Sequence, residues 1–243
     1  MSNPRFYFPV TLAAPASLAL PEAAAHHAAR VLRLRSGDAV TLFNGQGGEY
    51  AARITAIGKH DVTVIIERHD PVERESPLQV TLVQALSSGE RMDLTIQKAV
   101  ELGVSRIVPV ESERSVVRLK GERAAKRVAH WQQVAVSACE QCGRNRVPEV
   151  RMISPLDVWL AAEAPDAQRW LLLPGAETAL RDLPCPQQPI ELLIGPEGGL
   201  TDAEADAARH AGYQPLRLGP RVLRTETAAP ALLAALQALW GDY

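Results

Sequence analysis

The sequence predicts an α/β protein, in which a larger C-terminal part with a mostly parallel β-sheet follows a small β-rich module. From residue 78 onward, strand-like apolar runs alternate with helical patterns, which is typical of a parallel sheet. The runs WLLL and ELLI show no alternation of apolar and polar positions, as in strands buried on both faces. In residues 1–70, short β-branched runs are instead separated by Gly, Asp or Asn.

Length and composition are those of a globular protein. The chain has 243 residues, 47% hydrophobic and 22% charged, which suffices for one large domain or two smaller ones. No apolar run approaches the roughly 20 residues of a transmembrane helix, and the N-terminus MSNPRFYFPV lacks the apolar stretch of a secretory signal. Three cysteines do not suggest a disulfide scaffold. We therefore expect a cytoplasmic protein with no membrane association.

The N-terminal module is expected to contain one helix and three strands. The helix covers 22–34, EAAAHHAARVLRL, and the strands cover 38–45, 48–58 and 60–70. The segment PVERESP, residues 71–77, then places two prolines and three charges between apolar stretches, which is typical of a linker. We place a domain boundary there and expect domains over 1–72 and 73–243.

Strands and helices are expected to alternate in the C-terminal domain. The strands cover 78–86, 106–112, 168–175, 189–199 and 213–219, and the helices cover 91–104, 121–143, 156–164, 201–212 and 227–240. Gly103 supplies a helix C-cap, and Thr201 with Glu204 forms a capping box at another helix start. Because proline is tolerated in the first turn of a helix, Pro230 places the start of the last helix near Thr227.

Three strand ends in this domain are rich in glycine and proline: LLLPGAE at 171–177, LLIGPEGG at 192–199 and LRLGPRVLRTETA at 216–228. One such break is more often a plain turn. In open α/β sheets, however, ligands bind at the carboxyl ends of the strands. Three breaks on successive strands of the same half therefore favour a ligand site.

The second of these loops restricts the ligand. The sequence holds neither a P-loop string nor a dinucleotide-binding G-x-G-x-x-G after a strand. Pro196 lacks the N–H that a phosphate-binding loop uses, and Glu197 repels phosphate. The capping box already satisfies the helix that follows. The loop thus favours a neutral or cationic ligand rich in hydrogen-bonding groups, such as the sulfonium compound S-adenosyl-L-methionine.

The third loop carries polar residues that could do chemistry. Arg221, Arg224 and Glu226 lie just before the apolar last helix. They could act on a substrate or form a surface salt bridge, and spacing alone does not decide between the two. Basic residues also crowd 30–35 and 114–127, where phosphate contact competes with a solvated helix face.

No metal site is expected. His26 and His27 are neighbours on a helix and point about 100° apart, with no further ligand cluster in the sequence. Cys139 and Cys142 form a C-x-x-C without the second pair that zinc requires.

The long string IGPEGGLTDAE, followed by LRLGPRVLRTETA, resembles the signature of the bacterial ribosomal RNA (uracil-N3)-methyltransferase family, a branch of the SPOUT methyltransferases. The pieces QKAVELGV, ERS, EQCGRNRVPEV and HHAARVLRLRSGDAVTLFNGQGGEY agree with it. Together they cover nearly the whole chain. Each short piece is weak evidence alone, whereas the long combined motif is highly specific.

The resemblance implies a PUA-like RNA-binding β-barrel over 1–72 and a SPOUT methyltransferase domain over 73–243, with a deep trefoil knot that holds S-adenosyl-L-methionine. It implies a homodimer, which would bury the last helix, apolar on nearly every side. The implied substrate is N3 of a specific uridine in the 16S ribosomal RNA of the small ribosomal subunit. Two rivals stay open: a SPOUT enzyme that methylates another RNA position, such as a ribose 2′-hydroxyl, and a non-catalytic RNA-binding protein.

The expected site residues follow from these loops and from the resemblance. The cofactor-binding residues are Leu173, Pro174, Gly175, Ile194, Gly195, Pro196, Glu197, Gly198, Gly199, Leu218, Gly219, Leu223 and Thr225. The catalytic candidates are Arg224, as a cation that stabilises the uridine oxyanions, and Glu226, as a proton acceptor. The RNA-binding candidates are Arg5, Arg30, Arg33, Arg35, Arg114, Arg118, Lys120 and Arg144.

Overall fold

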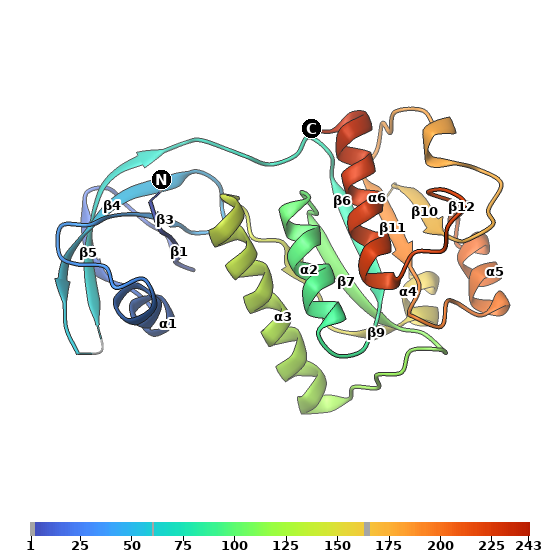
Figure 1. The fold of residues 1–243 in the computed structure, drawn as a ribbon, viewed down its shortest axis with the longest axis horizontal. Helices are drawn as coiled ribbons and strands as arrows, with labels where there is room; N and C mark the ends of the chain where they lie inside the picture. The colour runs from blue at the N-terminus through green and yellow to red at the C-terminus, as the bar shows by residue number, and fades with distance from the viewer. Residues whose placement is uncertain (1–2, 60, 163–165) are drawn as a thin grey trace. The chain divides into compact units, whose positions relative to one another are not determined.

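The computed structural model describes residues 3–59, 61–162 and 166–243 and divides into two compact units (Figure 1). Unit 1 comprises Met1–Glu75 with Cys139–Val147, and unit 2 comprises Ser76–Ala138 with Pro148–Tyr243. The return of residues 139–147 to unit 1 is not visible in the sequence, because local periodicity does not report which unit a segment packs against. The domain limits 1–72 and 73–243 stay a prediction.

Unit 1 is built on a five-stranded mixed sheet. Its strands are β1 (Arg5–Tyr7), β2 (Ala16–Ala19), β3 (Ala39–Phe43), β4 (Glu49–Ile57) and β5 (Val62–Asp70), in the order β1-β3-β4-β5-β2. β1 and β3 are parallel, and the other neighbours are antiparallel. β3, β4 and β5 confirm the three predicted strands, whereas β1 and β2 are too short to stand out in the sequence. Within the described residues β1 and β2 stand at the two ends of this strand order. The β-barrel over 1–72 stays a prediction.

The N-terminal helix is shorter than predicted. α1 (Glu22–His26) continues as a π-helical turn, His27–Val31, and ends before Leu34. Arg33 adopts the left-handed conformation, with a φ of 53°, and the Leu34 N–H bonds back to the Ala28 carbonyl. This reversal ends the helix as a C-terminal glycine would. A sequence with arginine at that position does not reveal it.

Unit 2 contains a seven-stranded sheet in which all pairings among the described residues are parallel. Its strands are β6 (Val80–Ala85), β7 (Arg106–Glu111), β8 (Glu149–Val150), β9 (Ser154–Pro155), β10 (Gln168–Leu172), β11 (Ile190–Ile194) and β12 (Gln214–Leu216). Their order is β12-β10-β11-β6-β7-β8, with β9 beside β7. The predicted mostly parallel sheet is confirmed. Only the two-residue strands β8 and β9 were not expected.

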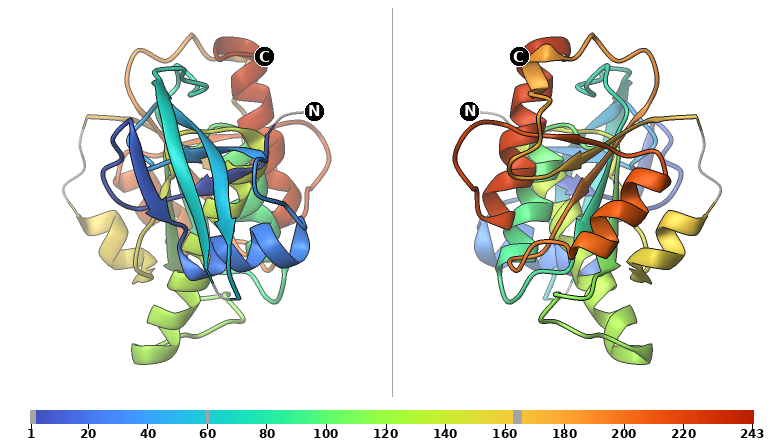
Figure 2. Two further views of the ribbon diagram at one scale, coloured as in Figure 1. Left: turned by 90° about the vertical axis from the view of Figure 1, so that its left-hand side faces the viewer. Right: turned by 90° about the vertical axis from the view of Figure 1, so that its right-hand side faces the viewer.

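Helices cover both faces of this sheet, as Figure 2 shows. They are α2 (Arg91–Glu101), α3 (Gly121–Cys142), α4 (Leu156–Ala161), α5 (Asp202–His210) and α6 (Thr225–Trp240), with a short 3-10 turn at Leu180–Asp182. α4 and α5 pack over one face, whose core includes Val83, Leu171 and Leu193. α6 packs against α2 and β11 on the opposite face. The helix predicted over 156–164 ends at Ala161, and its residues 163 and 164 lie outside the described residues.

Two predicted helix-end signals are confirmed, and one predicted helix start is corrected. Gly103 follows α2 with a φ of 81°, and the Thr201–Glu204 capping box is formed in both directions. α6, however, begins at Thr225 and not at Thr227, and it contains Pro230 in its interior. The Arg224 carbonyl accepts the N–H groups of Thr227 and Ala228 at 2.9 and 2.8 Å. The first turn therefore closes upstream of the proline, whose missing N–H cannot bond the carbonyl four residues before it.

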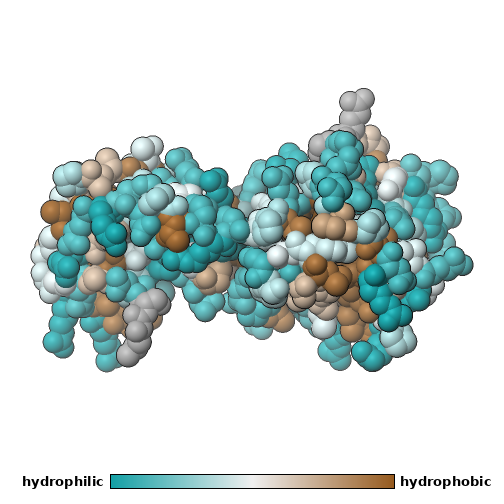
Figure 3. All heavy atoms as spheres, turned by 90° about the horizontal axis from the view of Figure 1, so that it is seen from above, coloured by the Kyte–Doolittle hydropathy of each residue, from teal (hydrophilic) through white to brown (hydrophobic). Residues whose placement is uncertain are grey.

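One face of the molecule is mostly polar. Figure 3 shows hydrophilic residues over most of the visible face of each unit, and the larger group of apolar residues on that face belongs to unit 2. No helix in the described ranges is long and apolar enough to cross a membrane.

Candidate functional site

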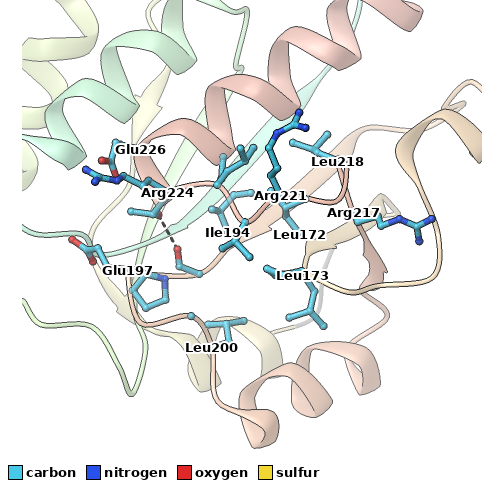
Figure 4. Close-up of a pocket in the computed structure, with 18 of the residues that line it drawn as sticks. Leu172, Leu173, Ile194, Glu197, Leu200, Arg217, Leu218, Arg221, Arg224 and Glu226 are labelled. Carbon is cyan, nitrogen blue, oxygen red and sulfur yellow. Dashed lines mark hydrogen bonds between the residues drawn. The ribbon is translucent and has the colours of Figure 1, made fainter.

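The three glycine-rich loops meet around one cavity of unit 2. Because β10, β11 and β12 are parallel, their carboxyl ends lie at the same edge of the sheet. The loops that follow them, together with the start of α6, enclose a cavity of about 380 Å³ (Figure 4). A cavity of this size is in the range that small-molecule sites occupy.

The cavity has an apolar middle and charged groups around it. Leu172 and Ile194 are direct neighbours in the β10–β11 register, and further leucines line the cavity from the three loops. In Figure 4 these apolar side chains occupy the centre of the view, while Glu197, Arg224 and Glu226 stand together at one end. This arrangement suits a ligand with both an apolar surface and polar groups at its ends.

Most of the predicted cofactor-binding residues line the cavity. Of the predicted set, only Gly175 and Gly198 are not among the lining residues. A side chain on Gly198 would place its Cβ 3.2 Å from the Arg114 Cβ, so this glycine makes room for a neighbouring segment. Gly175 has a φ of 81°, which the turn after β10 requires.

Thr225 lines the cavity, but its hydroxyl is already engaged. The Thr225 Oγ1 donates to the Gly195 carbonyl at 2.8 Å and accepts from the Gln84 Nε2 at 3.0 Å. Gln84 is fully buried in β6. The hydroxyl therefore fastens the loop after β11 to the start of α6.

Glu197 also forms hydrogen bonds with two residues, Ser88 and Arg91, that the sequence did not suggest as its partners. Its Oε1 accepts hydrogen bonds from the Ser88 N–H, the Ser88 hydroxyl and the Arg91 guanidinium, each at 2.9 Å. Burial raises the pKa of Glu197, but these hydrogen bonds lower it more, so its pKa lies below the usual range. The carboxylate is thus ionised and tied to the segment between β6 and α2. Its predicted contact with a ligand stays a prediction.

Arg91 joins the two acidic residues of the site. Besides its bond to Glu197, its Nε lies 3.7 Å from the Glu226 Oε1. Arg224 is the N-cap residue of α6 and is exposed, and neither Arg224 nor Arg221 forms an ion pair within the described residues. Both residues are among those that line the cavity.

Arg91 and Leu200 line the cavity from outside the three predicted loop segments. Four more lining residues fall within those segments but were not singled out as site residues: Leu172, Arg217, Val222 and Ala228. Arg91 begins the helix after β6, and β6 pairs with β11. The sequence does not give the order of the strands. The pairing of β6 with β11 brings the start of α2 to the sheet edge where the three loops lie. With four arginines and two glutamates, the cavity is also more basic than the loop 195–199 alone suggested.

Six of the predicted RNA-binding residues are exposed in their units: Arg30, Arg33, Arg35, Arg114, Arg118 and Lys120. Arg114 donates to the carbonyls of Gly198 and Leu200, and Arg118 pairs with Glu111 at 2.8 Å. These two therefore also hold loops in unit 2. RNA contact by all six stays a prediction.

Arg5 and Arg144 have structural partners within unit 1. Arg5 pairs with Glu49, donates to the Asn145 side chain at 2.6 Å and stacks over Phe43 at 5.0 Å. Arg144 is 5% exposed and pairs with Glu75 at 2.5 Å. These contacts account for both arginines without RNA, and the predicted RNA contact is untested.

Family models match both parts of the chain. An RNA methyltransferase domain matches residues 74–237. An RNA methyltransferase PUA domain matches residues 20–67. The chain belongs to the RNA methyltransferase family. This RNA methyltransferase is 34% identical to the ribosomal RNA small subunit methyltransferase E of Buchnera aphidicola subsp. Schizaphis graminum, over 98% of this chain and 97% of that protein.

Two solved structures are similar to this RNA methyltransferase over their full length. The ribosomal RNA small subunit methyltransferase E of Neisseria gonorrhoeae, solved bound to S-adenosyl methionine, is 44% identical, with a TM-score of 0.93 and 100% of both chains covered. A Legionella pneumophila protein, solved in complex with the bound cofactor SAM, is 41% identical, with a TM-score of 0.96 and 100% of both chains covered.

No side-chain cluster in the described part of this RNA methyltransferase has the makeup of a metal site with three or more His, Cys, Asp or Glu. Cys139 is a buried free thiol. Burial raises the pKa of Cys139 to about 12, which keeps it in the unreactive thiol form at neutral pH.

Proposed function

We propose that the protein is an S-adenosyl-L-methionine-dependent methyltransferase that methylates N3 of a specific uridine in 16S ribosomal RNA. The observation that carries the proposal is the cavity formed by the three predicted cofactor loops, in a chain 44% identical to a ribosomal RNA small subunit methyltransferase E solved with S-adenosyl methionine. The choice of uridine N3 comes from the sequence signature IGPEGGLTDAE and LRLGPRVLRTETA.

The residues present fit this cofactor. The apolar middle of the cavity, with Ile194 and Leu218, suits an adenine ring. The chain approaches itself closely at Gly195, where a Cβ would lie 3.2 Å from the Leu200 N; this tight turn leaves backbone groups at the cavity wall for the ribose and adenine edges. Arg221 lines the same cavity and can meet a carboxylate. When bound, the cofactor supplies an already activated methyl group.

The chain then has two tasks, positioning the uridine and removing its N3 proton. Positioning is the larger one, because in-line transfer of an activated methyl depends chiefly on orientation. Arg224, exposed at the cavity, is the cation that stabilises negative charge on the uridine oxygens. Glu226 is the proton acceptor. Its side chain is only 15% exposed and is held by Arg91, so a substrate N–H has to approach from the open side of the cavity.

RNA would contact the exposed arginines of unit 1. Arg30 lies in the π-helical turn, and Arg33 and Arg35 follow it. All three are exposed, and the family model of an RNA methyltransferase PUA domain covers them. Guanidinium groups contact phosphates without reading sequence. Unit 1 would therefore supply affinity, and the cavity of unit 2 would select the reacting base.

The proposal extends to the knot, the homodimer and the compartment. β11 lies between β6 and β10 and not at a sheet edge, an order compatible with the trefoil knot that the resemblance implies. Val222 is 78% exposed and Leu239 of α6 is 48% exposed, and a second copy of the chain would cover both. A substrate in the small ribosomal subunit places the protein in the cytoplasm.

The decisive experiment incubates small ribosomal subunits with methyl-labelled cofactor, followed by nucleoside mass spectrometry and mapping of the label. Label in 3-methyluridine at one position is the expected result. Label in a 2′-O-methylated nucleoside would replace the proposal by its first rival. Failure of the protein to bind S-adenosyl-L-methionine would favour a non-catalytic RNA-binding protein.

A further inference from the structure

We propose that Gln84, a buried residue that does not itself line the cavity, is a positioning residue for the cofactor site. It acts through Thr225 on the loop that follows β11. The inference rests on the proposed function, since it takes the cavity to be the S-adenosyl-L-methionine site. It adds a residue of β6 to a site that the sequence assigns to the loops after β10, β11 and β12.

Gln84 continues the row of residues that forms the middle of the cavity. Leu172 of β10 pairs with Ile194 of β11, and Ile194 pairs with Gln84 of β6. Leu172 and Ile194 both line the cavity, whereas Gln84 has no exposed surface. Gln84 is therefore the third residue of this row, after two apolar residues, and carries a primary amide. The amide bonds Thr225, the first residue of α6.

The amide forms the first link of a buried hydrogen-bond chain. Its Nε2 donates to the Ala85 carbonyl and to the Thr225 Oγ1, both at 3.0 Å. The Thr225 hydroxyl then donates to the Gly195 carbonyl at 2.8 Å. The two ends of this hydrogen-bond chain fix which groups donate, because the Ala85 and Gly195 carbonyls can only accept hydrogen bonds. Rotating the amide would turn its oxygen toward the Ala85 carbonyl.

The other side of the amide argues against a role in stability. The Gln84 Oε1 is buried and has no hydrogen-bond partner among the residues that the structure describes. An unpaired buried acceptor costs about as much as one or two ordinary hydrogen bonds contribute. The two bonds donated by Nε2 and the unpaired oxygen thus roughly cancel in the free energy of folding. The contribution of the amide is geometric: by donating to the Thr225 Oγ1, it orients the Thr225 hydroxyl toward the Gly195 carbonyl.

The orientation of the Thr225 hydroxyl affects two parts of the site. Gly195 belongs to the predicted cofactor loop, and Thr225 is the first residue of α6, between the catalytic candidates Arg224 and Glu226. With the Thr225 hydroxyl oriented by Gln84, the loop and the helix start are joined. Without Gln84 the hydroxyl can rotate away, and both parts lose their fixed geometry.

The test replaces Gln84 by Met, which keeps the length of the side chain and removes its hydrogen bonds. Affinity for S-adenosyl-L-methionine is measured by calorimetry, thermal stability by Tm, and turnover on small ribosomal subunits by kcat and KM. We expect the cofactor Kd to rise about tenfold, the loss of one or two hydrogen bonds. We expect kcat to fall as well, with KM for RNA and the Tm nearly unchanged.

Gln237→Met is the matched control. Gln237 is also a buried glutamine of unit 2, at 1% exposure, and its amide bonds Ser76 and the Leu102 carbonyl, away from the cavity. Both of its polar atoms are paired, so this variant should lower the Tm and leave the cofactor Kd unchanged. A drop in cofactor affinity equal to that of Gln84→Met would mean that any buried glutamine of the unit has the same effect, and would overturn the inference.

A double-mutant cycle with Thr225→Val completes the test. Because Gln84 and Thr225 act in one chain, the double variant should lose no more cofactor affinity than Thr225→Val alone. Additive losses would refute the coupling, as would an unchanged Kd in Gln84→Met. If Gln84→Met does not fold, Thr225→Val alone must still raise the Kd about tenfold. Wild-type protein that fails to bind the cofactor refutes the proposed function itself, a result distinct from all of these.

Discussion

Replacing Arg91 by Gln should weaken the binding of S-adenosyl-L-methionine at low ionic strength and much less at high ionic strength. The Arg91 guanidinium lies 2.9 Å from the Glu197 Oε1 and 3.7 Å from the Glu226 Oε1. Glu197 belongs to the cofactor loop and Glu226 to the first turn of α6. The substitution removes both ion pairs and leaves two carboxylates facing one cavity without their shared counter-ion.

The expected magnitude follows from the exposure of these groups. The side chain of Arg91 is 44% exposed, against 24% for Glu197 and 15% for Glu226. Partly exposed pairs of this kind contribute roughly 0.2–1 kcal/mol each. The loss of two such pairs, with repulsion between the carboxylates, amounts to about 1 kcal/mol, or a fivefold rise in the cofactor Kd. Screening at about 0.5 M salt should remove most of the difference.

Calorimetry at low and high salt measures the effect directly. Arg209→Gln is the control, because Arg209 is 45% exposed and pairs with Asp206 on α5, and neither of these two residues lines the cavity. Arg91→Lys should be intermediate, since an ammonium keeps the charge but lacks the fork that reaches both carboxylates. An equal Kd in wild-type protein and Arg91→Gln at low salt, or the same loss at both salt concentrations, would refute the electrostatic argument.

Three further predictions concern catalysis, a helix cap and a buried carboxyl. Arg224→Ala should abolish methylation of small ribosomal subunits and leave the cofactor Kd within a few-fold; unchanged turnover would end its assignment as the stabilising cation. Thr201→Ala removes the capping box of α5 and should cost about 1 kcal/mol, a fall in Tm of about 2–4 °C, whereas Thr201→Ser should retain most of the stability. Burial raises the pKa of Glu140, although the hydrogen bond from a backbone N–H lowers it in part. A carboxyl whose pKa is higher in the fold loses stability as the pH rises from its unfolded value through its folded value. Glu140→Gln should therefore raise the Tm relative to wild type at neutral pH, with the gain vanishing near about pH 4; an equal gain at both pH values would contradict this.

The local elements of unit 2 could be read from the sequence almost completely. The Thr201–Glu204 capping box depends on four consecutive residues and is formed as predicted. The start of α6 was predicted two residues late, at Thr227 and not Thr225. The position of Pro230 indicates where a helix tolerates a proline, but it does not indicate which residue supplies the first helical carbonyl acceptor. Arg33 shows the same limit in unit 1, since a left-handed arginine ends a helix without a sequence signal.

The candidate site was predicted in part, for a similar reason. The three loops were visible because each one breaks an apolar run, and parallel strands bring such breaks to one edge. Arg91 was not visible, because it lies in a helix after β6 and enters the site only through the pairing of β6 with β11. Arg5 and Arg144 read as free basic residues, yet each has an acidic partner, Glu49 and Glu75.

The sequence by itself therefore determined the α/β class, the two-part organisation of the chain, the capped helices and the loops that line the cavity. These follow from patterns within one strand or one helical turn, whose physical causes act between near neighbours. The tertiary structure decided which polar groups are engaged: Glu197 with Ser88 and Arg91, and Thr225 with Gln84. Such partners lie far apart in the chain, and they meet only because strand order places β6 beside β11.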